Sequence, residues 1–228
     1  MSSLFADLSL FPILLSLKVA GVGTLTALLL ALAAARLQAR RTSFTARILD
    51  GLCTLPMVLP PTVMGYYLIL LLGKRGFLGA ALANLGIELM FSWQGAVIAA
   101  TVVIFPLTYK AARAALESVD VRYEQVARTL GASEAKIFLT ISLPLAWRGI
   151  LAGSMLAFAR GMGEFGATLM IAGNIPYKTQ TLSLAIYDAF QAGNDDEALG
   201  LVLLASALCL TVLMSAEWFI GSWGNGHD

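Results

Sequence analysis

Two ionisable side chains, Arg160 and Glu164, lie four residues apart inside a long apolar stretch of the chain. On a helix this spacing puts both side chains on one face, where the guanidinium and the carboxylate can pair. Ionisable groups at membrane depth are costly, and they usually face the interior of a helix bundle or a water-filled cavity. The pattern therefore supports two hypotheses, a role in a transport pathway or gate and a structural ion pair between helices.

Glycines surround this pair, and Gly161, Gly163 and Gly166 match the letters of a dinucleotide-binding fingerprint. That fingerprint requires a preceding strand, whereas here it lies within an apolar span, so we do not predict nucleotide binding. Small residues at this spacing instead allow two membrane helices to approach each other closely.

The sequence offers no other arrangement of reactive side chains that indicates catalysis. Cys53 and Cys209 lie in apolar runs, and the single histidine, His227, is in the C-terminal tail. We find no nucleophile–base arrangement, no cluster with metal-ligand spacing and no GxxxxGK[ST] loop for ATP. We therefore predict no catalytic residue, no metal, no cofactor and no enzymatic activity of the chain itself.

The composition is typical of a membrane protein. Hydrophobic residues make up 58% of the chain and charged residues 13%, whereas a soluble domain has about 25% charged residues. The net charge of +1 and the lack of a basic cluster with interleaved aromatic residues give no indication of a nucleic-acid partner. The lipid bilayer is the surrounding that we expect for this chain. The first apolar run has no basic residue before it and exceeds a signal core of about 7–15 residues, so we expect a retained span.

A spanning helix needs about 20 largely apolar residues. Five stretches meet this requirement, at residues 12–35, 48–72, 94–114, 145–172 and 199–220. We therefore predict an all-α, polytopic membrane protein whose residues 1–228 form a single transmembrane domain. Between the spans, residues 77–91 are expected to lie along or dip into the outer face, and residues 181–191 to form a short helix.

Lysine and arginine in the loops predict the orientation, because cytoplasmic loops carry the excess of these residues. The first and third loops, with the adjoining end of the third span, contain Arg36, Arg40, Arg41, Arg47, Lys110, Arg113, Arg122, Arg128 and Lys136, whereas the second and fourth contain Lys74, Arg75 and Lys178. The first group should be cytoplasmic. Five spans then put the N-terminus outside and the C-terminus in the cytoplasm.

The second span contains Pro60, Pro61 and Thr62. Proline removes a backbone donor and bends a helix, and the freed carbonyls in a membrane need partners or water. The bend is either a structural kink or a feature that shapes a polar pathway, and these two interpretations are compatible. Together with Arg160, Glu164 and Thr168, these residues are our candidates for a pathway or gate, and the hydroxyls of Thr24 and Ser154 are further candidates to line a path.

A polar island interrupts the apolar chain between the third and fourth spans. Residues 121–130 form an amphipathic pattern, with Tyr123, Val126, Ala127 and Leu130 on one face and Arg122, Glu124, Gln125 and Arg128 pointing elsewhere. Gly131 can end this helix in a left-handed conformation, Ser133 can cap a second helix, and Pro144 can open the next span. We name residues 117–143 the elbow, which is either an interfacial linker or a docking surface.

The elbow resembles the signature of bacterial ABC-importer permeases, which reads Glu-Ala-Ala, three residues, Gly, nine residues, Ile, one residue, Leu-Pro. Gly131, Ile141, Leu143 and Pro144 match it in identity and spacing. Gln125, Val126 and Ala127 occupy the Glu-Ala-Ala positions, where only the last is identical. Further stretches are similar to the molybdate permease family, at residues 55–61, 65–66, 73–79, 91–96, 159–160 and 163–168.

This resemblance implies a type I ABC-importer permease in the bacterial cytoplasmic membrane that moves molybdate by alternating access. It implies a homodimer, a cytoplasmic ABC ATPase subunit that binds the ATP, and an extracytoplasmic oxyanion-binding protein. The implied ATPase-coupling residues are Gln125, Val126, Ala127, Leu130, Gly131 and Ala132. Sulfate and tungstate permeases share much of the pattern and remain alternatives, as does a secondary anion transporter or channel, which would explain Arg160 and Glu164 but not the signature.

Overall fold

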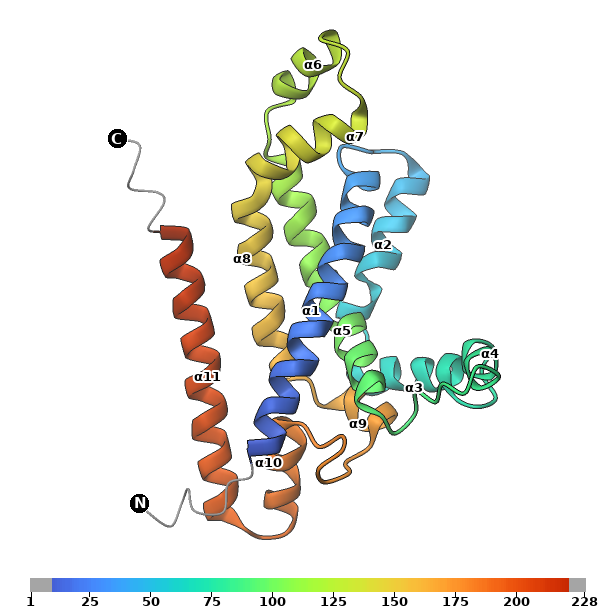
Figure 1. The fold of residues 1–228 in the computed structure, drawn as a ribbon, viewed down its shortest axis with the longest axis vertical. Coiled ribbons are helices and arrows are strands. Elements are labelled where there is room, and N and C mark those ends of the chain that lie inside the picture. Colours follow the sequence, from blue (N-terminus) through green and yellow to red (C-terminus); the bar gives the residue numbers. More distant parts are fainter. Residues whose placement is uncertain (1–9, 222–228) are drawn as a thin grey trace.

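The computed structural model describes the chain from residue 10 to residue 221, and its side chains up to residue 215. All regular elements in this part are helical (Figure 1). The helices are α1 (Leu10–Gln38), α2 (Phe44–Val58), α3 (Pro61–Leu72), α4 (Phe77–Ala83), α5 (Trp93–Glu117), α6 (Val121–Thr129), α7 (Glu134–Ile137), the π-helical turn η1 (Phe138–Ser142), α8 (Leu143–Met162), α9 (Gly166–Ala172), α10 (Leu182–Gln191) and α11 (Asp195–Gly221).

Helix α5 lies at the centre of the bundle and packs against α1, α2, α8 and α9 (Figure 1). Small residues let these helices approach closely, since a Cβ added at Gly23 of α1 would lie 3.4 Å from the Cβ of Ala100 in α5. The α5–α8 contact is closer still, because a Cβ added at Gly153 would lie 2.1 Å from the Cβ of Ala111. Lipid tails are as apolar as leucine, so packing of this kind holds membrane helices together.

The structure divides the second predicted span, residues 48–72, into α2 and α3, and the chain bends by 112° between them. Leu59 and Pro60 both have extended backbone conformations at the junction. A residue before proline is disfavoured in the helical region, and Pro61 starts α3 at a position where a missing N–H costs nothing. The paired prolines therefore break the span, rather than kink a continuous helix.

The fourth predicted span, residues 145–172, also differs from the structure at its C-terminal end. Helix α8 ends at Met162, the turn passes through Gly163, and α9 starts separately at Gly166. The four-residue spacing of Arg160 and Glu164 predicted that both lie on one continuous helix. In the structure Arg160 is in α8, whereas Glu164 is in the turn between α8 and α9.

Pro144 lies in the first turn of α8, as predicted, but the helical segment does not begin there. The helix begins at Glu134 and continues through η1 into α8. In η1 the Leu143 N–H donates to the Phe138 carbonyl, which is five residues earlier. A wider turn of this kind accommodates a proline that lacks an N–H and would collide with a carbonyl four residues back.

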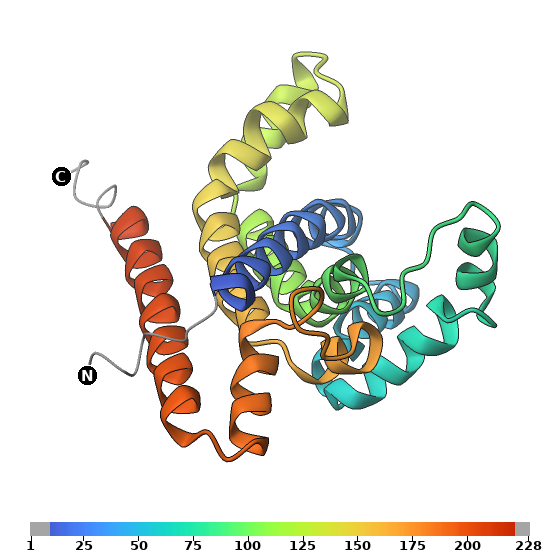
Figure 2. The ribbon, with the colours of Figure 1, turned by 60° about the horizontal axis from the view of Figure 1, so that its bottom comes forward.

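Helix α10 confirms the short helix predicted over residues 181–191, and α11 begins with Asp195, Asp196 and Glu197, which suit the positive end of its dipole. Residues 77–91 form α4 and an irregular segment that ends where the Phe91 N–H donates to the Ile171 carbonyl over 2.9 Å. Figures 1 and 2 both show α3 and α4 projecting from the bundle.

Four helical segments are long and apolar enough to cross a membrane, at residues 10–38, 93–117, 134–162 and 195–215, and the bent α2–α3 pair makes five when it is counted as one span. The prediction of an all-α fold with about five membrane-spanning segments is therefore confirmed. Both cysteines are free, and no group of three metal-ligating side chains occurs in the described part. His227 lies outside the described residues.

Two glycine-to-alanine substitutions test the small-residue packing. Gly153→Ala should lower the unfolding free energy by about 1–3 kcal/mol, because the new methyl group overlaps Ala111. Gly51→Ala is the matched control, since Gly51 is also helical but has no atom within 4 Å of an added Cβ. Thermal unfolding in detergent measures both, and equal midpoints would contradict the close α5–α8 contact.

Candidate functional site

The turn of the elbow is built around Gly131, which has φ of +79°. Asp120 caps α6 by accepting from the Arg122 N–H over 2.9 Å. At the other end of α6 the Ala132 N–H donates to the Ala127 carbonyl over 3.0 Å, which closes the helix as a glycine C-cap does. Ser133 then caps α7 by accepting from the Lys136 N–H over 3.4 Å. The left-handed turn at Gly131 and the Ser133 cap follow the sequence prediction, whereas the Asp120 cap was not predicted.

Helix α6 leaves most of its apolar stripe uncovered. Val126 is 59% exposed and Leu130 is 82% exposed, and Tyr123 is exposed beside them. Ala127 alone of the predicted stripe is buried. Of the other predicted coupling residues, Gln125 and Gly131 are exposed and Ala132 is half-buried. The elbow thus presents a set of apolar side chains that no described part of the chain covers.

The acidic side chain of Glu124 faces inward, which the sequence analysis missed. Its carboxylate accepts from Arg40 Nη1 over 3.0 Å and from the Ser142 hydroxyl over 2.9 Å. The signal available in the sequence was that Glu124 precedes the buried Ala127 by three residues and therefore shares its side of α6. No local pattern indicates Arg40, which is 84 residues away from Glu124.

A second ion pair braces the two helices of the elbow. Arg128 Nε donates to Glu134 Oε1 over 2.5 Å, and Arg128 Nη2 donates to Glu134 Oε2 over 3.1 Å. This hydrogen bonding raises the pKa of the Arg128 guanidinium above its usual range, so the pair stays charged wherever Glu134 is ionised.

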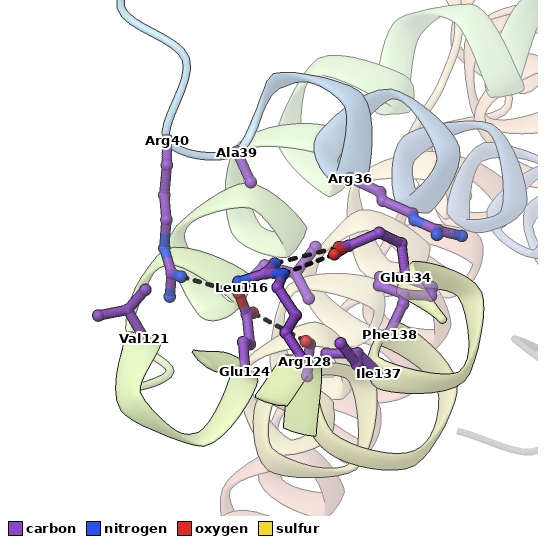
Figure 3. A pocket seen from close by; sticks show the side chains of 11 residues that line it. Arg36, Ala39, Arg40, Leu116, Val121, Glu124, Arg128, Glu134, Ile137 and Phe138 are labelled. Atoms are coloured by element: carbon purple, nitrogen blue, oxygen red, sulfur yellow. Dashed lines mark hydrogen bonds and ion pairs between the residues drawn. The ribbon is translucent and has the colours of Figure 1, made fainter. Parts of the chain in front are cut away.

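These charged groups surround a cavity of about 320 Å³ between the end of α1 and the elbow (Figure 3). The Arg36 guanidinium lies 4.6 Å from the centre of the Phe138 ring at the same site. The cavity is lined by Arg36, Ala39, Arg40, Leu116, Val121, Glu124, Arg128, Glu134, Ile137, Phe138 and Ser142.

The Arg160–Glu164 pair lies at the opposite end of α8. Arg160 Nη1 donates to Glu164 Oε2 over 3.1 Å, and the Glu164 side chain is 2% exposed whereas that of Arg160 is 44% exposed. The other carboxylate oxygen, Oε1, accepts from the Ala167 N–H over 3.0 Å. Glu164 therefore satisfies a free backbone donor in the first turn of α9, where the membrane supplies no water to do so.

The two helix breaks lie against each other. A Cβ added at Gly166, in the first turn of α9, would lie 2.9 Å from the Cβ of Pro61 at the start of α3. A Cβ added at Gly65 would lie 2.7 Å from the Cβ of Met170, so the two helices stay close along their length. The structure thus brings Pro61 and Thr62 near the Glu164 turn, although they are about a hundred residues apart in the sequence.

Among the other candidates for a pathway, Pro60 is exposed at the same break and Thr168 is buried in α9. The Thr168 and Thr24 hydroxyls find no hydrogen-bond partner among the described residues. The Ser154 hydroxyl donates to the Ile150 carbonyl of its own helix over 2.8 Å. The Lys18 ammonium of α1 lies 3.5 Å from the centre of the Trp93 ring in α5.

The helices define a multi-pass, all-α membrane protein. Comparison with known proteins identifies its family. Residues 23–221 match the family of binding-protein-dependent transport system inner membrane components, so the chain belongs to this family.

Named relatives narrow the similarity. The chain is 46% identical over 208 residues to the molybdenum transport system permease protein ModB of Escherichia coli, a match that covers 90% of this chain and 91% of that protein. It is 45% identical over 206 residues to the protein of the same name in Haemophilus influenzae, covering 90% of each. The chloroplastic sulfate permease 2 of Chlamydomonas reinhardtii is 38% identical over 174 residues, covering 76% of this chain and 47% of that protein.

Solved structures support the fold. An inward-facing MetNI methionine ABC transporter chain aligns with a TM-score of 0.69 at 15% identity, covering 92% of this chain and 94% of that chain. A chain of a bacterial ABC transporter that imports alginate aligns with a TM-score of 0.74 at 15% identity, covering 93% and 79% respectively.

Substitution of Glu164 tests its role at the break between α8 and α9. Glu164→Ala should lower the unfolding free energy by about 1–3 kcal/mol, because it leaves the Ala167 N–H and the Arg160 guanidinium without their partner. Glu164→Gln retains an acceptor for Ala167 and should cost less.

The control is Lys74→Ala, which removes the exposed Lys74–Glu88 ion pair of 2.9 Å and should change stability by about 0–1 kcal/mol. Thermal unfolding in detergent ranks the three variants. A Glu164→Ala protein as stable as the parent would show that packing alone holds this break.

Proposed function

We propose that this chain is the permease subunit of an ATP-driven importer that moves molybdate across the bacterial cytoplasmic membrane. The observation that carries the proposal is the elbow, where exposed Val126 and Leu130 lie on a helix fixed to the bundle by charged contacts. Relatives named for molybdenum transport, similar over about nine-tenths of the chain, favour molybdate over sulfate. The shorter match to a sulfate permease has lower identity.

Energy would come from a separate ATPase subunit that docks on the elbow. The sequence has no GxxxxGK[ST] loop to bind ATP, so the chain itself would hold no cofactor and hydrolyse no ATP. Docking would use Gln125, Val126, Leu130, Gly131 and Ala132, while buried Ala127 anchors α6 to the bundle. When the ATPase subunits close on ATP, they would move the elbows and switch the spans between inward-open and outward-open states.

The remaining partners follow from the same proposal. Two copies of the chain would form the pathway between them, and an extracytoplasmic binding protein would deliver the oxyanion. The elbow would face the cytoplasm, with the N-terminus outside and the C-terminus inside. Support for this orientation is that the basic α1–α2 connection and the elbow lie at one end of the bundle, and α10 at the other (Figure 1).

The packed breaks between α2 and α3 and between α8 and α9 are the proposed pathway element. Pro60, Pro61 and Thr62 are exposed on the single subunit, and Glu164 and Arg160 hold the second break beside them. Irregular backbone at membrane depth is tolerated where it is buried in protein or lines a cavity. Thr168, with a buried hydroxyl that has no partner among the described residues, would offer a donor to a passing oxyanion.

Reconstitution tests the function. The chain, its cognate ATPase and its binding protein are assembled in proteoliposomes, and molybdate uptake is measured with and without ATP. We expect uptake only with ATP, and competition by tungstate and sulfate reports the selectivity. Uptake at the same rate without ATP would contradict the proposal and favour a secondary transporter.

Two valine substitutions separate an ABC importer from a secondary transporter. Gly131 and Gly193 have φ of +79° and +74°, and neither has an atom within 4 Å of an added Cβ. A β-branched residue at either position is strained by about 1–2 kcal/mol. Gly131→Val should abolish ATPase coupling, because it misdirects α6, whereas Gly193→Val, in the turn between α10 and α11, should not.

ATPase co-purification and uptake per ATP hydrolysed measure this difference, and membrane insertion should be intact in both variants. Equal loss of uptake in the two variants would indicate a general effect of strain and would argue against docking at the elbow.

A further inference from the structure

Helix α6 contacts the bundle through few side chains, among them the buried Ala127 and the carboxylate of Glu124. Its apolar residues Val121, Tyr123, Val126 and Leu130 are all more than 40% exposed, so they contribute little packing to the rest of the chain. Glu124, by contrast, is only 16% exposed and holds Arg40 over 3.0 Å and Ser142 over 2.9 Å. Charge-assisted hydrogen bonds between partly buried groups are stronger and more directional than exposed ones.

Arg40 contacts three neighbouring segments, which are the end of α5, the connection that follows it, and α6. It lies between α1 and α2 with φ of +62°, a conformation that is uncommon for a residue other than glycine. Its guanidinium donates to Glu124 and to the carbonyl of Val119, and its backbone N–H donates to Glu117 Oε1 over 3.2 Å. Figure 3 shows the Arg40 side chain extending towards Glu124 of the elbow, while the Arg40 backbone N–H donates to Glu117 at the end of α5.

The charged contacts continue from Arg40 to α2. Glu117 accepts from Arg113 Nε over 2.8 Å, and Arg113 Nη1 donates to Asp50 of α2 over 2.6 Å. Lys110 donates to the other oxygen of Asp50 over 2.8 Å. Helix α2 leads directly to the break at Pro60, so one series of ion pairs and hydrogen bonds joins the elbow to the element proposed to shape the pathway.

We propose that Glu124 and Arg40 are a positioning pair that transmits movement of the elbow to the ends of α1 and α2. The proposal rests on the proposed function, since it assigns how ATPase movement reaches the spans. It concerns side chains that face the bundle rather than the ATPase, and it separates attachment of α6 from docking on its exposed face. Without the pair, α6 moves with the ATPase, but α1 and α2 do not follow it.

The test uses Glu124→Gln, Arg40→Gln and the double variant in the complete complex with ATPase and binding protein. Each single variant should keep the ATPase bound and hydrolysing ATP, while molybdate uptake per ATP falls about tenfold, as expected for a residue that carries coupling energy between sites. The double variant should be no worse than the worse single variant, because both substitutions remove the same interaction.

The matched control is Glu88→Gln, which breaks the exposed Lys74–Glu88 ion pair of 2.9 Å outside the elbow, and its uptake per ATP should equal that of the parent. Loss of the ATPase from the complex in both single variants would make the pair a folding element and overturn the proposal. Additive losses in the double variant would overturn it as well.

The parent complex in the same vesicles reports on the proposed function separately. Uptake by the parent without ATP would contradict the function itself. Uptake that depends on ATP in the parent, with an unchanged ratio of uptake to hydrolysis in the variants, would contradict only the positioning role of Glu124 and Arg40.

Discussion

The lack of water in the hydrocarbon core is the constraint on which this structure depends. Each backbone donor and acceptor at that depth needs a partner within the protein, yet the chain breaks two of its spans. Glu164 meets part of this requirement, because its carboxylate accepts from the Ala167 N–H while it pairs with Arg160. Gly65 and Gly166 let the segments after the two breaks pack directly on each other, so that irregular backbone is buried in protein rather than exposed to lipid.

The ion pairs at the two ends of the bundle differ in what they hold. At the α8–α9 break, a nearly buried carboxylate fixes a helix terminus and a single arginine. At the elbow, Glu124 joins segments that are far apart in sequence, from the α1–α2 connection to η1. The first arrangement stabilises a local turn, whereas the second joins a weakly packed helix to the bundle. This difference explains why α6 can expose apolar side chains and still hold a defined position.

Much of the fold could be predicted from the sequence because apolar stretches and local turn residues act over short distances. The lengths of the hydrophobic runs indicated the spanning helices, and Asp120, Gly131 and Ser133 have the residue types that cap helices. The bend at Pro60 and Pro61 was expected, but its angle of 112° was not, since proline limits the local backbone without setting the direction of the next helix. The π-helical turn before Pro144 was likewise absent from the prediction.

The sequence by itself determined the all-α membrane class, the helix–glycine–helix elbow and the residues that resemble an importer signature, because these depend on composition and on spacings of a few residues. Only the tertiary structure decided that Glu124 faces the bundle, that Arg40 meets it, and that the turn at Glu164 packs beside Pro61. Each of these contacts joins segments distant in sequence. Their geometry comes from how α1, α5 and α8 pack through small residues, which no local pattern encodes.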